Sequence, residues 1–335
     1  MKIKTRLCDL LNLSVPIFQA PMGGATTPRL ASAVANYGGL GMLPLGAWPM
    51  EKCEKLIDET LALTDQAIGV NLVLEWDQHE RLEMSLKKGI KIIWFFWGDP
   101  SPFVEKIHAQ GGKVILTVSN AAQAKLAIDA GVDVIVTQGW EAGGHIWGEV
   151  ATMPLVPTVV DVVDGKVPVV VAAGGIADGR GMAAAMALGA EGIVLGTRLL
   201  ASHEVGIHEQ YKNRILNAKE TDTVYTDLFD KGWPNSYMRV LRNSTYDQWV
   251  KADKPPSGKR PGEHDIITQF CPGSPVERYT HNLPAPMMEG DLEPLAQYAG
   301  QCVGLVKKRQ SVHEILDEVV ADAIKRINVC QTLVF

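Results

Sequence analysis

A histidine that follows two glycines is the first candidate for chemistry in this sequence. The run Glu141-Ala142-Gly143-Gly144-His145 comes directly after an apolar stretch, residues 132–138, that is typical of a β-strand. Glycine lets a backbone approach a flat ligand closely because no Cβ intervenes, and an imidazole exchanges a proton near neutral pH. The position just past the C-terminal end of a strand is where α/β barrels hold their catalytic groups. We therefore predict that His145 is catalytic.

The other histidines and the acidic residue of this run give weaker signals. Glu141 is compatible with a second acid and equally with a solvated residue at the end of a strand. The remaining histidines lie in segments that look helical or loop-like, so we assign no role to His79, His108, His203, His208, His264, His281 and His313.

Two further glycine loops predict a phosphate site. Ala173-Gly174-Gly175 and Gly196-Thr197 follow the seventh and eighth apolar runs. In barrels, the loops after these two strands commonly bind phosphate through backbone N–H groups and a helix N-terminus. Tight turns without a ligand are the alternative, but the matching positions of the two loops favour phosphate binding.

Polar side chains and a kinked turn at strand ends favour one shared ligand. Asn71, Thr117 and Gln138 stand at or near the ends of the third, fifth and sixth apolar runs. Each could cap a turn, yet a single ligand explains them together better than separate caps do. After the first run, Pro21-Met22-Gly23-Gly24 offers a bent backbone and a soft apolar side chain, which suit the edge of a flat aromatic ring. A plain turn is the alternative there.

Competing chemistries lack their motifs. The sequence contains no HExxH, no acidic triplet spaced for a metal, no GxSxG elbow and no GxxxxGK[ST] loop. Its five cysteines are scattered, odd in number and form no CxxC pair, which favours reduced thiols in a cytoplasmic protein over disulfides or a metal site.

The elements that must position these residues repeat along the first two thirds of the chain. Short, continuous apolar runs alternate with helix-like segments, which suits a parallel sheet buried on both faces. Eight such units predict a (β/α)8 TIM barrel. A doubly wound open sheet is the alternative, but residues 19–24 do not form GxGxxG. The predicted strands are 15–20, 39–43, 68–72, 90–96, 113–118, 132–138, 167–172 and 192–195.

Capping signals mark several of the helices. Thr27-Pro28 and Trp48-Pro49 open two helices, with proline at or near the first helical position. Asn120 and Asp178 are N-caps of helices over 121–130 and 179–188, and each of these is followed by glycine. An apolar stripe predicts a closing helix over 303–329.

The regular pattern stops near residue 203. Residues 203–300 contain many prolines and few continuous apolar runs, and 254–262 is typical of an exposed loop. We expect residues 1–202 and 301–335 to form the barrel. Residues 203–300 are then a smaller, partly helical lid or substrate domain over its mouth.

Composition excludes several classes of partner. The chain has 335 residues, 46% of them hydrophobic and 21% charged, and a net charge of −6, so no basic surface indicates nucleic acid or an anionic membrane. The start of the chain, 1–6, lacks the apolar core of a signal peptide, and no apolar run approaches the roughly 20 residues that span a bilayer. We expect a cytoplasmic enzyme with a small-molecule substrate, as a monomer or homodimer. Eight scattered tryptophans predict no single apolar patch.

Seven segments together carry a family resemblance: residues 16–24, 69–71, 141–145, 173–180, 196–198, 239–243 and 298–305. On these the chain resembles the nitronate monooxygenases, formerly called 2-nitropropane dioxygenases, which are FMN-dependent (β/α)8-barrel enzymes. The resemblance spans nearly the whole chain and is more specific for the flavin superfamily than for the substrate. It implies oxidative denitrification of alkyl nitronates or nitroalkanes to carbonyl compounds and nitrite, with O₂ and FMN.

The resemblance also implies roles for individual residues. His145 matches the catalytic histidine, as a base toward nitroalkanes or as an imidazolium toward bound nitronates. Thr117 stands where relatives often have lysine. By position, the flavin would be lined by Met22, Gly23, Asn71, Thr117, Gln138 and Gly143, and its phosphate held by Ala173, Gly175, Gly196 and Thr197.

Two other branches of the superfamily stay open. The flavin-dependent enoyl-ACP reductases share the Glu-Ala-Gly-Gly-His motif and resemble residues 288–293 and 299–301. NADH:quinone reductases are a further branch, and both would use NAD(P)H. A barrel that binds flavin or phosphate without catalysis is the alternative from a different class.

Overall fold

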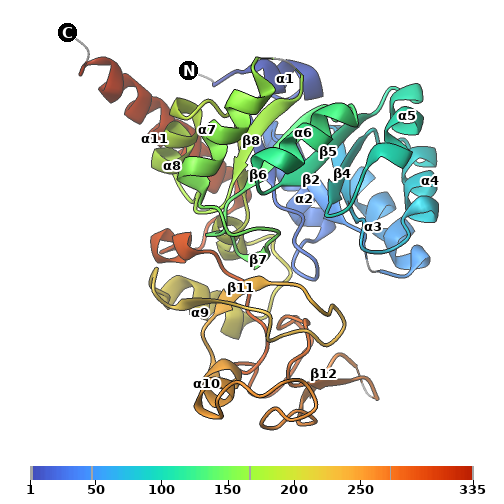
Figure 1. The fold of residues 1–335 in the computed structure, drawn as a ribbon, viewed down its shortest axis with the longest axis vertical. Helices are drawn as coiled ribbons and strands as arrows, with labels where there is room; N and C mark the ends of the chain where they lie inside the picture. Colours follow the sequence, from blue (N-terminus) through green and yellow to red (C-terminus); the bar gives the residue numbers. More distant parts are fainter. Residues whose placement is uncertain (1–2, 47, 166, 272, 334–335) are drawn as a thin grey trace.

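The computed structural model describes residues 3–46, 48–165, 167–271 and 273–333. Its centre is a nearly closed barrel of eight parallel strands (Figure 1), in the order β1-β9-β8-β6-β5-β4-β3-β2. A bridge between Phe18 and Leu40 joins the first strand to the start of the second and brings the two ends of the sheet together. The barrel strands are β1 Ile17–Gln19, β2 Gly41–Pro44, β3 Ile68–Val73, β4 Ile92–Phe96, β5 Lys113–Val118, β6 Val134–Gln138, β8 Val169–Ala173 and β9 Gly192–Leu195.

The predicted TIM barrel is therefore confirmed, and each of the eight predicted strands is present. The open doubly wound sheet is excluded, because each barrel strand has a parallel neighbour on both sides once the bridge is counted. The strands are trimmed mainly at their starts: β1 begins at Ile17 and β6 at Val134, each two residues later than the apolar run. The first residues of these runs lead into the sheet as loop.

Helices follow the strands on the outside of the barrel. The predicted caps are present: the side chains of Thr27, Asn120 and Asp178 accept hydrogen bonds from backbone N–H groups in the first turns of α2, α6 and α8. The helices of the barrel are α2 Pro28–Tyr37, α3 Met50–Leu61, α4 His79–Lys87, α5 Ser101–Ala109, α6 Ala121–Asp129, α7 Thr152–Val163, α8 Gly179–Ala187 and α11 Val312–Gln331.

The closing helix begins later than the sequence predicts. Its expected range was 303–329, but α11 starts at Val312, and Gln301–Leu305 forms a separate 3₁₀ helix, η2. Ser311 and Glu314 form a capping box, which fixes the start of α11 there. The helix packs closely on α8, since a Cβ on Gly179 would lie 2.2 Å from the backbone nitrogen of Ala323. It is thus the eighth barrel helix, although 116 residues, 196–311, separate it from β9.

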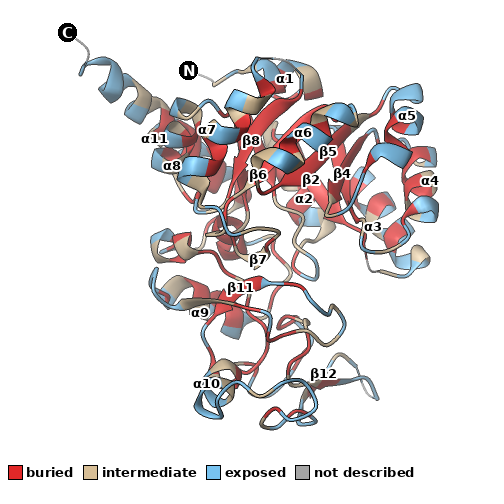
Figure 2. Ribbon diagram, in the orientation of Figure 1, coloured by how far each residue is buried: buried red, intermediate tan, exposed pale blue. Residues whose placement is uncertain are grey.

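Two apolar layers hold the barrel together. One fills its interior and includes Phe18, Val134 and Val136, and the other lies between the sheet and the outer helices. Figure 2 shows the strands buried and the outer faces of the helices exposed. A short helix, α1 Arg6–Leu11, contributes Leu7 and Cys8 to the interior layer and closes the end of the barrel opposite to residues 203–300 (Figure 1).

Residues 203–300 enter between η1 (Thr197–Ala201) and η2 and extend from the end of the barrel where the strands finish (Figure 1). This inserted segment is partly helical, as expected, but it also carries short antiparallel strands that the sequence did not predict. One of its sheets, β10-β11-β7, includes the two-residue strand β7 Gly144–His145 from the barrel. Its other elements are α9 Glu209–Asn217, β10 Thr223–Thr226, β11 Met238–Leu241, α10 Ser244–Lys251, β12 Ile266–Gln269 and β13 Pro275–Glu277.

Two absences hold for the described part of the chain. No helix there has the length and apolar character to cross a bilayer. Nor does that part bring three or more histidine, cysteine or acidic side chains together as a metal site. Residues 1–2, which belong to the segment 1–6 discussed in the sequence analysis, lie outside the described residues. The cysteines are free thiols: Cys8, Cys53, Cys271, Cys302 and Cys330.

Candidate active site

His145 lies on β7, where the barrel and the inserted segment share a sheet. It pairs with Met238 of β11, and Ile146 donates its N–H to the carbonyl of Tyr237 at 3.0 Å. The glycine before it has a φ of +82°, a conformation that L side chains rarely adopt. Gly144 therefore turns the chain away from β6 so that His145 can join β11.

Gln138 fixes this loop from the end of β6. Its Nε2 donates to the carbonyl of His145 at 3.0 Å, and its Oε1 accepts the N–H of Trp147 at 3.3 Å. Both ends of the amide are thus used to hold the residues on either side of Ile146. Gln138, which the sequence predicts to line a flavin, therefore positions the backbone of His145, the candidate catalytic residue.

Glu141 has a structural role in the same loop. Its carboxylate accepts the N–H of Thr152 at 2.9 Å and the hydroxyl of the same residue at 3.0 Å. Thr152 is the first residue of α7, so the negative charge meets the positive end of that helix. The reading of Glu141 as a second acid gains no support from this geometry.

Gly143 is required by a neighbouring backbone. A Cβ at this position would lie 2.5 Å from the nitrogen of Gly300, which belongs to the chain returning from the inserted segment. The N–H of Gly300 in turn donates to the hydroxyl of Thr197 at 2.9 Å. Gly143 and Thr197, predicted as flavin and phosphate contacts, therefore both hold the returning chain against the barrel.

Asn71, Thr117, Gln138 and Ala173 occupy inward-facing positions near the C-terminal ends of β3, β5, β6 and β8. They alternate with residues such as Val70, whose side chains pack toward the outer helices. The strand registers place these four on the inner wall of the barrel.

An unpredicted residue, Trp94 of β4, links two of these positions. Its indole N–H donates to the hydroxyl of Thr117 at 2.8 Å, and its carbonyl accepts the side-chain amide of Asn71 at 2.9 Å. No sequence pattern indicates this role, because Trp94 stands inside an apolar run. Thr117, which was predicted to line a flavin, therefore accepts a hydrogen bond from the neighbouring strand.

Three glycines of the predicted loops have open space where a Cβ would lie, whereas a Cβ on Gly174 would be 2.8 Å from the carbonyl oxygen of Gly139. A Cβ on Gly23 would meet nothing within 4 Å, and one on Gly175 would come no closer than 3.7 Å, to Glu141. At Gly196 the nearest atom is the Cβ of Ala20, at 3.4 Å. Met22 is half-buried beside the core layer that contains Leu195.

Aromatic rings surround the imidazole of His145. The ring of Trp233 stacks on it at a centroid distance of 4.0 Å and an angle of 25°, while Tyr298 lies at 5.6 Å and Trp97 at 6.2 Å. The Nε2 of His145 is buried and has no hydrogen-bond partner among the described residues. Burial, with a smaller contribution from His281, lowers the pKa of His145 to about 3. The sequence predicts an imidazole that exchanges a proton near neutral pH. In the structure, the lowered pKa instead keeps the imidazole of His145 neutral at that pH.

His281, to which the sequence assigned no role, belongs to the surroundings of His145. Its Nδ1 lies 2.7 Å from the carbonyl of Lys231, so this nitrogen carries a proton and donates. Its own carbonyl accepts the hydroxyl of Tyr298 at 2.7 Å. More than 130 residues separate the two histidines in the chain, and no local pattern links them.

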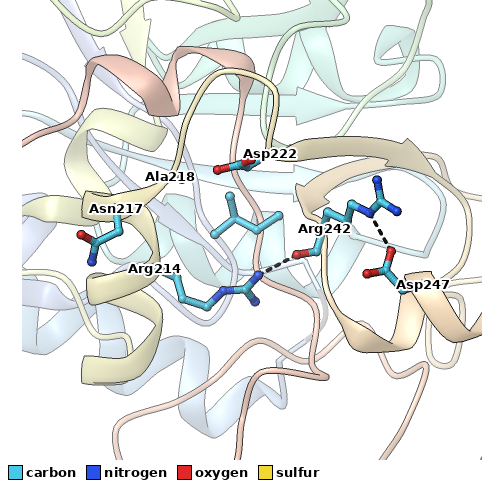
Figure 3. Close-up of a pocket in the computed structure, with 7 residues that line it drawn as sticks. Arg214, Asn217, Ala218, Asp222, Arg242 and Asp247 are labelled. Atoms are coloured by element: carbon cyan, nitrogen blue, oxygen red, sulfur yellow. Dashed lines mark hydrogen bonds and ion pairs between the residues drawn. The ribbon is translucent and has the colours of Figure 1, made fainter.

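A hollow of about 340 Å³ lies elsewhere on the inserted segment (Figure 3). It contains none of the predicted site residues. Its two arginines already have partners: Arg214 donates to the carbonyl of Arg242 at 2.6 Å, and Arg242 donates to Asp247 at 2.6 Å. Its charges are therefore largely satisfied.

The fold is thus a (β/α)8 barrel, and the Nε2 of His145 has no hydrogen-bond partner in the described part of the chain. The model of the nitronate monooxygenase family matches residues 4–80 and 75–322, and the chain belongs to that family of oxidoreductases.

Similar proteins cover most or all of the chain. A 5-hydroxy-7a-methyl-1-oxo-octahydro-1H-indene-4-carboxyl-CoA dehydrogenase of Rhodococcus jostii RHA1 is 32% identical, with 97% of each chain covered. A probable nitronate monooxygenase of Staphylococcus saprophyticus is 36% identical over 75% of this chain and 83% of its own. The solved structure of FabK from Thermotoga maritima is 32% identical, has a TM-score of 0.82, and is matched over 99% of this chain and 100% of its own.

Proposed function

We propose that this chain is an FMN-dependent oxidoreductase that acts at a carbon next to a strongly electron-withdrawing group, with alkyl nitronates and nitroalkanes as its substrates and O₂ as the oxidant. The observation that carries the proposal is the buried Nε2 of His145, which has no hydrogen-bond partner among the described residues. A neutral imidazole is the form that accepts a proton, and such a carbon is acidic enough to release one.

The residues present fit the flavin. At Gly23 nothing lies within 4 Å of where a Cβ would be, and at Gly175 nothing lies closer than 3.7 Å, so a flat group would be free to approach the backbone at both positions. Asn71 and Ala173 would then face it from the inner wall of the barrel, and the loops after β8 and β9 would hold its phosphate through backbone N–H groups. When bound, FMN supplies the acceptor for the electrons that leave the substrate.

His145 would take the proton from the α-carbon of a neutral nitroalkane at Nε2. Gln138 and the β7–β11 pairing hold its backbone, and the ring of Trp233 covers one face, so the imidazole has little freedom to turn. Its lowered pKa disfavours an imidazolium that would stabilise a bound anion. We further propose that residues 203–300 are the domain that covers the substrate, since they supply Trp233.

A second candidate function is oxidation or reduction of an acyl thioester. The relatives matched over nearly their full length include a CoA-ester dehydrogenase, and FabK is matched over its full length including the inserted segment. A thioester also acidifies the carbon next to it, so the same imidazole could serve either chemistry. The NADH:quinone reductases, the other branch left open by the sequence, would also use a nicotinamide as the electron donor.

The experiment is an anaerobic absorption spectrum of the purified, FMN-loaded protein with the nitronate of nitroethane, then in a separate sample with NADH or NADPH. The proposal expects the flavin to lose its colour with the nitronate alone, and nitrite to be released once air is admitted. Rapid loss of colour with a nicotinamide and none with the nitronate would overturn it in favour of a reductase.

A further inference from the structure

Three tryptophans that are far apart in the sequence meet beside His145. Trp76 lies on the loop after β3, Trp97 on the loop after β4, and Trp233 on the inserted segment. The ring centroid of Trp233 is 4.8 Å from that of Trp76 and 4.9 Å from that of Trp97. The three rings therefore form one continuous surface, called here the tryptophan wall.

The backbone at Trp97 is held in an unfavourable conformation. Its φ is +58° although it carries a bulky side chain, and Gly98 follows with a φ of +68°. A Cβ on Gly98 would lie 2.5 Å from the Cβ of Leu74, so the loops after β3 and β4 are pressed together here. Such strain persists only where the surroundings impose it, and it is concentrated at functional sites.

Trp233 is held by contacts on both sides of it. The ammonium of the nearby Lys231 pairs with Glu277 at 2.6 Å and donates to the carbonyl of Glu263 at 2.6 Å. Gly232 fits against His281, where a Cβ would lie 2.3 Å from the ring. The N–H of Trp233 closes a turn onto the carbonyl of Asp230 at 3.0 Å. The inserted segment thus presents this ring in a defined place.

The tryptophan wall is not a closed core. The side chains of Trp76, Trp97 and Trp233 are each only half-buried. The imidazole of His145, whose Nε2 has no partner among the described residues, lies beside Trp97 and Trp233. A substrate whose reacting carbon approaches this nitrogen must place its remaining groups near these rings. Aromatic surfaces favour flat rings and bulky apolar groups through stacking and burial.

We propose that Trp76, Trp97 and Trp233 form one side of the substrate site and select substrates that carry an aromatic or bulky apolar group beside the reacting carbon. The proposal rests on the proposed function, because its first test uses turnover of nitroalkanes, and it names the substrate class of the same site. Small nitroalkanes would react, but they carry no group that contacts the tryptophan wall.

The first test compares the kcat/KM for 2-phenylnitroethane with that for nitroethane. We expect the wild-type protein to prefer the phenyl compound, and the substitutions Trp233→Leu and Trp97→Leu to reduce that preference roughly tenfold, the size of one lost aromatic contact. Trp249→Leu is the control, because its indole donates to Pro255 in the same inserted segment. An unchanged preference in both wall variants would overturn the proposal.

The second test does not depend on turnover. Nitrobenzene has no α-hydrogen and so cannot lose the proton that His145 would take, and its binding can be followed by calorimetry. We expect its Kd to rise roughly tenfold in Trp233→Leu and to stay unchanged in Trp249→Leu. If nitronates are not turned over but this shift is seen, the tryptophan wall stands and the proposed reaction fails. If the Kd does not change, the wall fails whatever the reaction.

Discussion

The barrel and the inserted segment are stabilised in different ways. The barrel rests on continuous apolar strands between two large hydrophobic layers. The inserted segment joins one of these layers through residues such as Tyr211, Ile215 and Leu241, and it has two small apolar clusters of its own. It also contains a buried network in which Arg260 pairs with Asp230 and Glu263 and lies over the ring of Tyr279. The barrel provides the scaffold, while the inserted segment supplies most of what surrounds His145. Chemistry at the site thus depends on the less regular region.

The largest expected effect comes from the residue where the two regions meet. His145→Gln should lower turnover of neutral nitroalkanes by about 10²–10⁴-fold, the usual contribution of a positioned general base. Preformed nitronates need no proton removal, so their turnover should fall much less. Steady-state kinetics on both substrate forms measures the difference.

His313→Gln is the matched control, because this histidine pairs with Asp317 on the exposed surface of α11. Equal losses on both substrate forms of the His145 variant would contradict the role as a base.

The next effect should separate the stabilities of the two regions. Arg260→Met leaves the buried carboxylate of Glu263 without its cation, which typically costs about 3–5 kcal/mol. We expect hydrogen exchange to accelerate in residues 203–300 while the barrel strands keep their protection. Equal acceleration in the barrel would show that the two regions unfold as one unit.

An exposed ion pair provides the control for that measurement. Arg326→Ala removes a pair with Asp322 on α11, which should cost no more than about 1 kcal/mol.

Acid should reproduce the effect of Arg260→Met. Burial opposes ionisation of Glu263, but backbone N–H donors and Arg260 outweigh it and lower its pKa to about 2. The stabilisation is therefore complete above pH 4.5 and is lost as the pH falls toward 2.

The same contrast explains how far the sequence could be interpreted. The barrel could be predicted because each unit is local: Asn120 caps α6 and Asp178 caps α8 within a few residues of their apolar runs. The strands β10 and β11 were missed, since they are short and are stabilised by pairing with distant residues.

The candidate site divides in the same manner. His145 and the glycine loops could be found from motifs, whereas His281 and Trp233 are brought to His145 only by the fold of residues 203–300. Even the start of α11 depended on a capping box that the apolar stripe did not reveal. Contacts between residues far apart in the chain leave no periodicity to recognise.

A smaller effect should appear in the pH dependence of stability. Because the pKa of His145 is lowered to about 3 in the folded protein, the unfolded chain binds a proton at this residue between about pH 6.5 and pH 3 that the folded chain does not. The free energy of unfolding should therefore fall with decreasing pH, by up to about 1.4 kcal/mol per pH unit from this residue alone.

Urea titrations of the wild type and His145→Gln between pH 6 and pH 4 would isolate that contribution. The variant should show a shallower pH dependence, whereas His264→Gln, at a side chain that is 87% exposed, should follow the wild type. Parallel curves for the wild type and the His145 variant would show that the imidazole is not kept neutral by the aromatic rings.

The smallest effect tests the inner wall of the barrel without touching the inserted segment. Thr117→Val removes the acceptor for the indole N–H of the buried Trp94 and leaves that donor without its partner, which should cost about 1–3 kcal/mol. Since the valine has nearly the same shape, the strands should keep their register, and the loss should be seen as a lower urea midpoint with an unchanged slope. Thr158→Val is the control, because that hydroxyl bonds the carbonyl of Pro154 within an exposed turn of α7. If hydrogen exchange in residues 203–300 stays unchanged in Thr117→Val, the barrel interior and the inserted segment respond independently; faster exchange there would show that this pair also supports the chain around His145.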